Sequence, residues 1–209
     1  MKTKSMSKTF FVAILGLTMT CALAQETAKP AASQSMRNLQ AAYLGEAQAS
    51  GFYLESARQA QRDGYPDVAK LFRAASLSEA IHRDNHRRAI RFLGATPQRI
   101  PAGQPKIKST RDNLTESVAD ERHESRVMYP DYIRTARRER SPSAERTFRF
   151  ARETERAHAK LFQRALDNLG GKPATDYFVC QTCGMTTMDS VPAVCSVCRS
   201  SGLDYRKVE

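Results

Sequence analysis

Two Glu-x-x-His pairs have residue types and a spacing that suit metal chemistry. Glu79 with His82 and Glu155 with His158 repeat at an offset of 76 residues. Side chains at positions i and i+3 of a helix project from one face, so each pair can present a carboxylate and an imidazole to the same ion. The alternative for a single pair is a chance arrangement on a solvated helix face. The exact repetition argues against that alternative.

One further glutamate lies upstream of each pair. Glu46 and Glu121 are offset by 75 residues, so each half of the chain carries one Glu and one Glu-x-x-His. Several buried carboxylates without a cation would be strongly unfavourable. One Glu from each of two helices with a Glu-x-x-His from each of two others is the di-metal pattern of ferritin-like four-helix bundles. Mixed carboxylate and imidazole ligands favour iron or manganese.

Four cysteines near the C-terminus form a second cluster. They make two Cys-x-x-Cys turns, Cys180 with Cys183 and Cys195 with Cys198, separated by 11 residues. Two such turns complete a tetrahedral four-sulfur site for iron or zinc. A tail this short buries little core, so a bound metal must supply much of its folding free energy. In an exported chain, disulfide bonds are the alternative, but the paired spacing favours a metal.

Helices are needed to place the glutamates and histidines together. From about residue 33 to residue 171, apolar residues recur every three or four positions. Breaks near residue 64, between 94 and 109 and near 141 predict four helices at about 34–63, 66–93, 111–139 and 142–168, as two hairpins joined by a long connection. A kink is expected at Pro130 in the third helix. The Glu and Glu-x-x-His positions then fall mid-helix at matching heights.

Composition excludes several classes of protein. The chain is 41% hydrophobic and 26% charged, which is ordinary globular usage. A mean hydropathy of −0.54 excludes a polytopic membrane protein. The net charge of +11 favours acidic partners in a general way. The arginines are spread along the predicted helices without interleaved aromatic residues, so we expect no nucleic-acid partner.

The N-terminus has the features of an export signal. Residues 1–24 combine lysines, the apolar stretch FFVAILGLTM and a small-residue cleavage site that ends at Ala24. The apolar run is too short for a stable membrane span. We therefore expect a signal peptide over residues 1–24 and a periplasmic mature protein without a membrane partner, in which a bundle over 33–170 precedes a cysteine domain over 176–209.

Several segments together resemble the rubrerythrin family. LGEAQASGFY (44–53), the two Glu-x-x-His segments and ERHESRVMYP (121–130) match its helix motifs in order and spacing, and the tail is similar to its rubredoxin-like module. The resemblance implies an all-α four-helix ferritin-like bundle followed by a small, metal-stabilised, β-rich rubredoxin-like domain. It also implies a homodimer, in which the relay iron of one chain serves the di-iron centre of its partner.

The family resemblance also implies a ligand set. Carried over by matching position, the di-iron ligands are Glu46, Glu79, His82, Glu121, Glu124, Glu155 and His158. Glu124 is an acid beyond the symmetric set, because Ala49 stands at the equivalent place in the first half. An extra carboxylate there can exchange with His82 as the charge on the metal changes. The alternative is that Glu124 solvates a helix face.

Other residues near the expected centre have less specific signals. Tyr53 and Tyr129 match family tyrosines that hydrogen-bond near the metals, although a simple core role is the alternative for both. For His86, four residues after His82, the alternatives are a place directly behind the metal ligands and an exposed position in an Arg-rich stretch, and we expect the exposed position. Phe178 is expected to pack on the cysteine cluster. Met185 and Ser196 depart from the rubredoxin-like pattern and leave the choice between iron and zinc open.

Three functions compete at this stage. The leading prediction is a peroxide reductase that uses a di-iron centre and electrons relayed through a four-cysteine iron site, with Glu124, His82 and Tyr53 in catalytic roles and an electron donor that the sequence does not identify. The second is ferritin-like oxidation and handling of ferrous iron, with structural zinc on the cysteines. The third is a basic zinc-ribbon protein whose bundle only mediates binding.

Overall fold

The computed structural model describes residues 32–171 and 175–209. The expected export signal over residues 1–24 lies outside these described residues. Within the described ranges, no helix combines the length and the apolar character that crossing a membrane requires.

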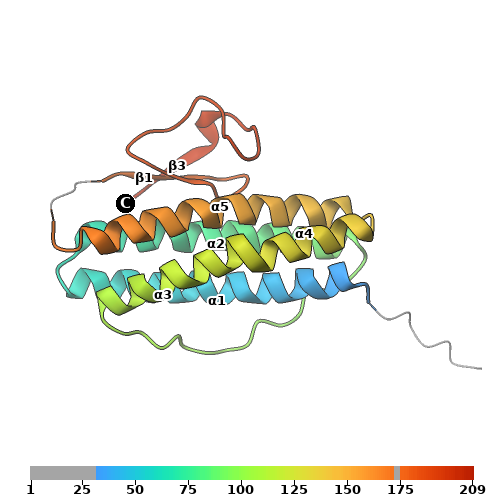
Figure 1. The fold of residues 1–209 in the computed structure, drawn as a ribbon, viewed down its shortest axis with the longest axis horizontal. Coiled ribbons are helices and arrows are strands. Elements are labelled where there is room, and N and C mark those ends of the chain that lie inside the picture. The colour runs from blue at the N-terminus through green and yellow to red at the C-terminus, as the bar shows by residue number, and fades with distance from the viewer. Residues whose placement is uncertain (1–31, 172–174) are drawn as a thin grey trace, which may run out of the picture. The chain divides into compact units, whose positions relative to one another are not determined.

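Helices form a bundle of four rods joined as two hairpins (Figure 1). The third rod is continuous but contains a π-helical turn, η1, between α3 and α4. The helices are α1 (Gln34–Arg62), α2 (Pro66–Phe92), α3 (Thr110–His123), η1 (Glu124–Met128), α4 (Tyr129–Arg138) and α5 (Pro142–Asp167). These bounds lie within one or two residues of the four predicted helices, and the predicted bundle is confirmed.

Local chemistry explains the helix ends. Gly64 adopts a φ of +83° after α1, a conformation that other residues rarely take, and Pro66 opens α2 at a position whose N–H needs no partner. The carboxylate of Asp63 accepts hydrogen bonds from the backbone N–H of Thr110, at 3.1 Å, and from its hydroxyl, at 2.6 Å. The end of α1 is thereby tied to the start of α3.

A π-helical turn, η1, lies directly before the segment that contains Pro130, where the sequence predicts a kink; the kink itself stays a prediction. Pro130 lacks the N–H that would continue the α-helical ladder. Just before it, the N–H of Tyr129 bonds to the carbonyl of Glu124, five residues back. Such wide turns insert one extra residue and often occur at functional sites. Here the turn begins at Glu124.

Two apolar clusters fill the bundle and leave a polar layer between them. One cluster contains Phe72, Leu114 and Phe162, and the other contains Leu39 and Phe148. Along α1, α2 and α5, the Glu and Glu-x-x-His positions fall between the residues of the two clusters. The apolar packing therefore holds the helices together on both sides of the candidate metal ligands.

A small antiparallel sheet follows the bundle. Its strands are β1 (Tyr177–Cys180), β2 (Thr186–Met188) and β3 (Tyr205–Val208), in the order β2-β1-β3, with a 3-10 turn, η2 (Gly202–Asp204), before β3. Tyr177, Val179 and Val208 belong to the same apolar cluster as residues of α2. The sheet thus packs against the bundle (Figure 1), while the cysteines form a small buried cluster of their own.

Candidate di-metal centre and cysteine site

The four helical rods bring six buried ligand side chains into one layer. Each rod contributes at mid-length, and none of the six side chains is more than 3% exposed. They are Glu46 from α1, Glu79 and His82 from α2, Glu121 from α3, and Glu155 and His158 from α5.

These six residues form two overlapping groups. One group is Glu46, Glu79, His82 and Glu155, and the other is Glu79, Glu121, Glu155 and His158; within each group the ligand atoms lie within 4.8 Å of one another. Glu79 and Glu155 belong to both groups. The arrangement can therefore hold two ions, with two carboxylates placed to bridge them.

Both imidazoles turn the same nitrogen toward the carboxylates. The Nδ1 atom of His82 lies 2.8 Å from Oε2 of Glu79 and 3.0 Å from Oε1 of Glu155. The Nδ1 atom of His158 lies 3.1 Å from Oε1 of Glu79 and 3.1 Å from Oε2 of Glu155. Nδ1 is thus the nitrogen that each ring offers to an ion, and Nε2 is left to contact other parts of the chain.

The electrostatics of the layer indicate that it is built for cations. Burial and the repulsion of neighbouring carboxylates raise the pKa of Glu46 and Glu121, the latter to about 8. Burial lowers the pKa of His82, but Glu155 and Glu79 outweigh it and raise this pKa to about 10. Oε1 of Glu79, Oε2 of Glu121 and both carboxylate oxygens of Glu155 are buried without a hydrogen-bond partner. Four carboxylates and two neutral imidazoles fit two divalent ions.

Glu124 lies beside this cluster and not within either group. Its side chain is half-buried at the start of η1, and burial together with Glu155 raises its pKa well above the usual value. Glu124 lines a cavity of about 640 Å³ with Tyr53, Glu79 and Glu121. The segment that connects α2 to α3 forms another wall of the same cavity. The cavity therefore joins Glu124 to the candidate ligands.

The two tyrosines are core residues that also bond to candidate ligands. The Tyr53 hydroxyl donates to Oε1 of Glu121 at 2.6 Å. The Tyr129 hydroxyl donates to Oε1 of Glu46. Both rings are buried.

The expectation that His86 is exposed is wrong. Its ring is fully buried, and its Nε2 lies 3.2 Å from the Tyr129 hydroxyl. His86 is four residues from His82 and so shares its helix face. The spacing of four residues from His82 indicates a buried position, whereas the neighbouring arginines favoured the expectation of an exposed one.

The cysteines form a compact four-sulfur group. Their Sγ atoms lie within 4.8 Å of one another, and none of the four is in a disulfide bond. Cys198 is half-buried, whereas Cys180, Cys183 and Cys195 are buried. A hydrogen bond from Cys183 and further bonds lower the pKa of Cys180 to about 4, which favours the metal-binding thiolate.

The aromatic side chain that packs on the sulfurs is not the expected one. Tyr205 and Phe150 contact the cysteine cluster, together with Met185 and Val197. Phe178 does not, which corrects that expectation. Side chains alternate along β1, and Tyr177 and Val179, on either side of Phe178, are the ones buried in the bundle's apolar cluster.

The cysteine turn docks directly on the metal layer of its own chain. Nε2 of His82 lies 3.0 Å from the carbonyl oxygen of Cys183, and Nε2 of His158 lies 3.0 Å from the Thr186 hydroxyl. The Ser78 hydroxyl donates to the carbonyl of Gly184 at 2.8 Å. This contact lies within one chain and brings the cysteine site next to the di-metal layer of the same chain. The arrangement in which the cysteine site serves a partner chain stays a prediction.

Close docking requires a glycine at position 184. Gly184 has a φ of +85°, and a Cβ atom there would lie 2.5 Å from Nε2 of His82 and 2.7 Å from the Ser78 hydroxyl. Any side chain would therefore push the cysteine turn away from α2.

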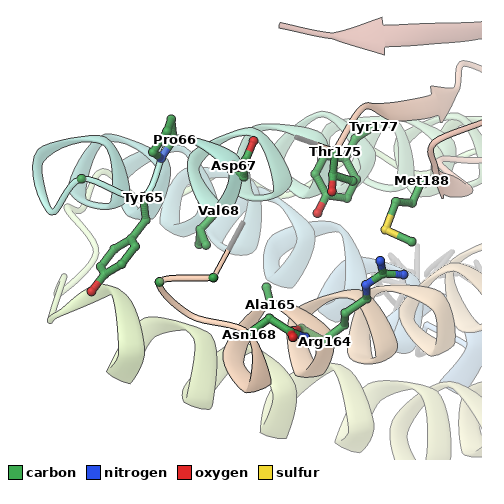
Figure 2. Close-up of a pocket in the computed structure, with 13 residues that line it drawn as sticks. Tyr65, Pro66, Asp67, Val68, Arg164, Ala165, Asn168, Thr175, Tyr177 and Met188 are labelled. Atoms are coloured by element: carbon green, nitrogen blue, oxygen red, sulfur yellow. The ribbon is translucent and has the colours of Figure 1, made fainter. Parts of the chain in front are cut away.

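A separate cavity lies where the bundle meets the sheet. It has a volume of about 410 Å³ and contains Asp67, Arg164, Tyr177 and Met188 in its walls (Figure 2). Burial and the charge of Asp67 raise the pKa of Tyr177 to about 12. Among the described residues that line this cavity there is no His, Cys or Glu, so it is distinct from both candidate metal sites.

Comparison with known proteins agrees with this geometry. The family model described as rubrerythrin matches residues 37–166. Rubrerythrin-2 of Clostridium acetobutylicum is 35% identical over 163 residues, which cover 77% of this chain and 89% of that protein. The chain belongs to the rubrerythrin family.

Other members and a solved structure extend the match into the cysteine domain. Nigerythrin of Nitratidesulfovibrio vulgaris is 27% identical over 170 residues, covering 81% of this chain and 84% of that protein. The structure of fully reduced, all-ferrous nigerythrin superimposes with a TM-score of 0.79 at 25% identity, covering 88% and 91% of the two chains. A Mycobacterium tuberculosis bacterioferritin, at a TM-score of 0.59, 17% identity and coverage of 67% and 86%, shares the fold alone.

Family membership and geometry together define the cofactors. The bundle carries a rubrerythrin-type di-iron site with carboxylate and histidine ligands, and the four cysteines form a site for a single iron or zinc. The predicted fold class is confirmed. As a member of the rubrerythrin and nigerythrin group of di-iron oxidative-stress proteins, this chain is a redox enzyme.

Proposed function

We propose that this protein reduces hydrogen peroxide to water at the di-iron site, with electrons that arrive through an iron held by the four cysteines. The 3.0 Å contact between His82 and the Cys183 carbonyl carries the proposal. It joins a candidate ligand of one site to a cysteine of the other through a single hydrogen bond.

The cavity beside Glu124 is the proposed route for peroxide. It reaches Glu79 and Glu121, two of the candidate ligands, and its volume of about 640 Å³ is large enough for a small neutral molecule. Bound iron supplies electrons, and the overall reaction joins one peroxide with two electrons and two protons to give two water molecules. The protein must therefore deliver protons to the buried di-iron site.

Glu124 is the proposed proton donor. Burial and nearby carboxylates raise the pKa of Glu124, which favours the protonated form that a proton donor needs. Tyr53, whose hydroxyl donates to Oε1 of Glu121, keeps that carboxylate oriented on the opposite wall of the cavity. In this proposal Glu124 supplies a proton, and the oriented Glu121 carboxylate supplies a hydrogen-bond acceptor, at the place where the O–O bond of peroxide breaks.

His82 has a second role in this proposal, because its two nitrogens serve different sites. With Nδ1 directed at the carboxylates, Nε2 carries the ring proton and donates it to the Cys183 carbonyl. That bond fixes the tautomer and the orientation of the ring. The same reasoning applies to His158, whose Nε2 faces the Thr186 hydroxyl.

The competing function, ferrous iron oxidation with structural zinc on the cysteines, makes a different prediction. We would prepare one protein with iron at the cysteine site and one with zinc there, each with a full di-iron centre. Steady peroxide reduction driven by an external one-electron donor should be more than about tenfold slower in the zinc form. Equal turnover in the two forms would reject the relay and favour the competing function.

Export and self-association are further proposals. Removal of residues 1–24 would leave Gln25 as the first residue of the mature chain. Mass spectrometry of the protein isolated from its native host would test this directly, and a mature chain that begins at Met1 would contradict it. Sedimentation of the metal-loaded protein would test the expected homodimer.

A further inference from the structure

A line of polar side chains runs from Glu46 into the apolar core. The Tyr129 hydroxyl donates to Glu46, Nε2 of His86 lies 3.2 Å from that hydroxyl, and Nδ1 of His86 lies 3.1 Å from the Thr147 hydroxyl. All four side chains are at most 5% exposed. The line joins α1, α4, α2 and α5. The proposed reaction does not use His86 or Thr147, the two members farthest from the metal ligands.

The donor in each hydrogen bond of this line can be assigned in turn, starting from Glu46. Glu46, as an ionised ligand, can only accept, so Tyr129 donates to it. The Tyr129 oxygen then accepts the proton of Nε2 of His86, and Nδ1 of His86 accepts from Thr147. A ring that donates from Nε2 to Tyr129 and accepts at Nδ1 from Thr147 is a neutral imidazole with its proton on Nε2. A neutral imidazole carries one N–H, which matches its one donor role.

Packing alone does not account for an imidazole at this position. The His86 ring lies between Tyr129, at a centroid distance of 6.1 Å, and Phe148, at 5.6 Å, beside the apolar cluster that contains Ile90. A leucine would fill such a space without the cost of burying two polar atoms. The hydrogen bonds to Tyr129 and Thr147 are what offset that cost.

We propose that His86 is a positioning residue for the di-iron centre and acts on Glu46 through Tyr129. By donating to the Tyr129 oxygen, His86 polarises the phenol O–H and strengthens its bond to Glu46, because hydrogen bonds in a chain reinforce one another. Glu46 then presents less negative charge to its iron. Weaker donation stabilises ferrous iron relative to ferric iron, so the chain raises the midpoint potential of the di-iron centre. This inference needs only the di-iron site and not peroxide reduction.

The first test is a potentiometric titration of iron-loaded variants. His86→Leu removes the donor but keeps the volume, and we expect two irons per bundle and a lower midpoint potential. His86→Gln retains an N–H that can reach Tyr129 and should restore most of the wild-type potential. Ile90→Val, a packing change in the same apolar cluster, should leave the potential unchanged. A wild-type potential in His86→Leu, or equal shifts in the Leu and Gln variants, would overturn the proposal.

A double-mutant cycle shows whether His86 acts through Tyr129. Tyr129→Phe deletes the donor to Glu46 and should lower the potential at least as much as His86→Leu. Adding His86→Leu to Tyr129→Phe should then cause no further shift, because residues in one hydrogen-bonded line are not additive. Additive shifts would show another route and contradict the proposal. If His86→Leu binds fewer than two irons, Thr147→Val provides the test instead. A small decrease in the midpoint potential of the di-iron centre would support the proposal, and an unchanged potential would reject it.

Discussion

The two metal sites of this chain are built in opposite ways. The di-iron ligands come from four long helices, with an apolar cluster on each side of the ligand layer. The four cysteines come from two short turns, and the apolar side chains of their sheet, such as Val179 and Val208, are buried against the bundle. In the first region the scaffold creates the site. In the second region, metal binding must supply much of the free energy that keeps the cysteine domain folded.

The two sites also differ in what they leave open. The di-iron layer opens on a cavity with Glu124 in its wall. The cysteine site uses all four of its ligands and offers no position for a substrate, which is typical of a closed site. Cys198 is its one half-buried member. The open site of the bundle is therefore the place for substrate chemistry, and the cysteine site can stabilise its domain or, when it holds iron, transfer electrons.

The largest expected effect comes from changing the open site alone. Glu124→Ala should retain two irons, because Glu124 is in neither ligand group, but it should reduce peroxide turnover by about a hundredfold through loss of the proton donor. Steady peroxide consumption and iron content would be measured together. Glu116→Ala, which changes an acid on the wall of the same cavity, is the matched control and should be nearly silent. Unchanged turnover in Glu124→Ala at full iron occupancy would reject this role.

Breaking the closed site should separate the two regions. Cys198→Ser removes one of four thiolates, so the cysteine domain should lose its metal and its ordered sheet, while the helical circular dichroism of the bundle and its two irons persist. Turnover with an external donor should fall more than about tenfold. Loss of helical signal along with the cysteine metal would show that the bundle depends on the cysteine domain, which would contradict the independence of the two regions.

A pH series sharpens the contrast within the bundle. Without metal, the raised pKa values of Glu121, about 8, and of His82, about 10, mean that both side chains bind protons at neutral pH. A metal must displace these protons, so its affinity should increase as pH rises and decrease as pH falls. Between pH 6 and pH 7 the ferrous or manganous affinity should rise about tenfold for each proton displaced. Calorimetry in two buffers would count those protons, and an affinity independent of pH would be inconsistent with this charge arrangement.

The last prediction concerns His82, which contacts both the carboxylates of the bundle and the cysteine turn. His82→Ala removes one neutral ligand and the bond to the Cys183 carbonyl, so the iron content of the bundle should fall from two toward one. The cysteine metal should be retained, because its four sulfurs are untouched. Metal analysis of the purified variant checks both statements. Retention of two bundle irons would show that His82 is not a ligand.

Regular spacing explains what could be predicted from the sequence. The helix bounds follow from apolar periodicity and from breaks such as Gly64 and Pro66. The six clustered ligands follow from an internal repeat whose spacing places them on facing helix sides. The likeness to rubrerythrins added Glu124 and the two tyrosines, for which the repeat alone gave no signal.

Features that depend on packing between distant elements could not be predicted in this way. His86 is surrounded by arginines in the sequence but lies on the buried side of α2. Phe178 precedes the first cysteine by two residues, yet the strand that carries it buries Tyr177 and Val179 in the bundle instead. Docking of the cysteine turn on its own bundle depends on Gly184, which in sequence is only an ordinary turn glycine.

The most direct test of the account follows electrons between the sites. The fully iron-loaded protein would be reduced without oxygen and mixed rapidly with a few equivalents of hydrogen peroxide. The red absorption of ferric iron on four thiolates should return in step with peroxide consumption, and it should return far more slowly in Glu124→Ala. A cysteine iron that stays reduced after peroxide has oxidised the di-iron centre, or an equally fast return of colour in Glu124→Ala, would contradict the proposed path from the cysteine site through His82 to the di-iron centre.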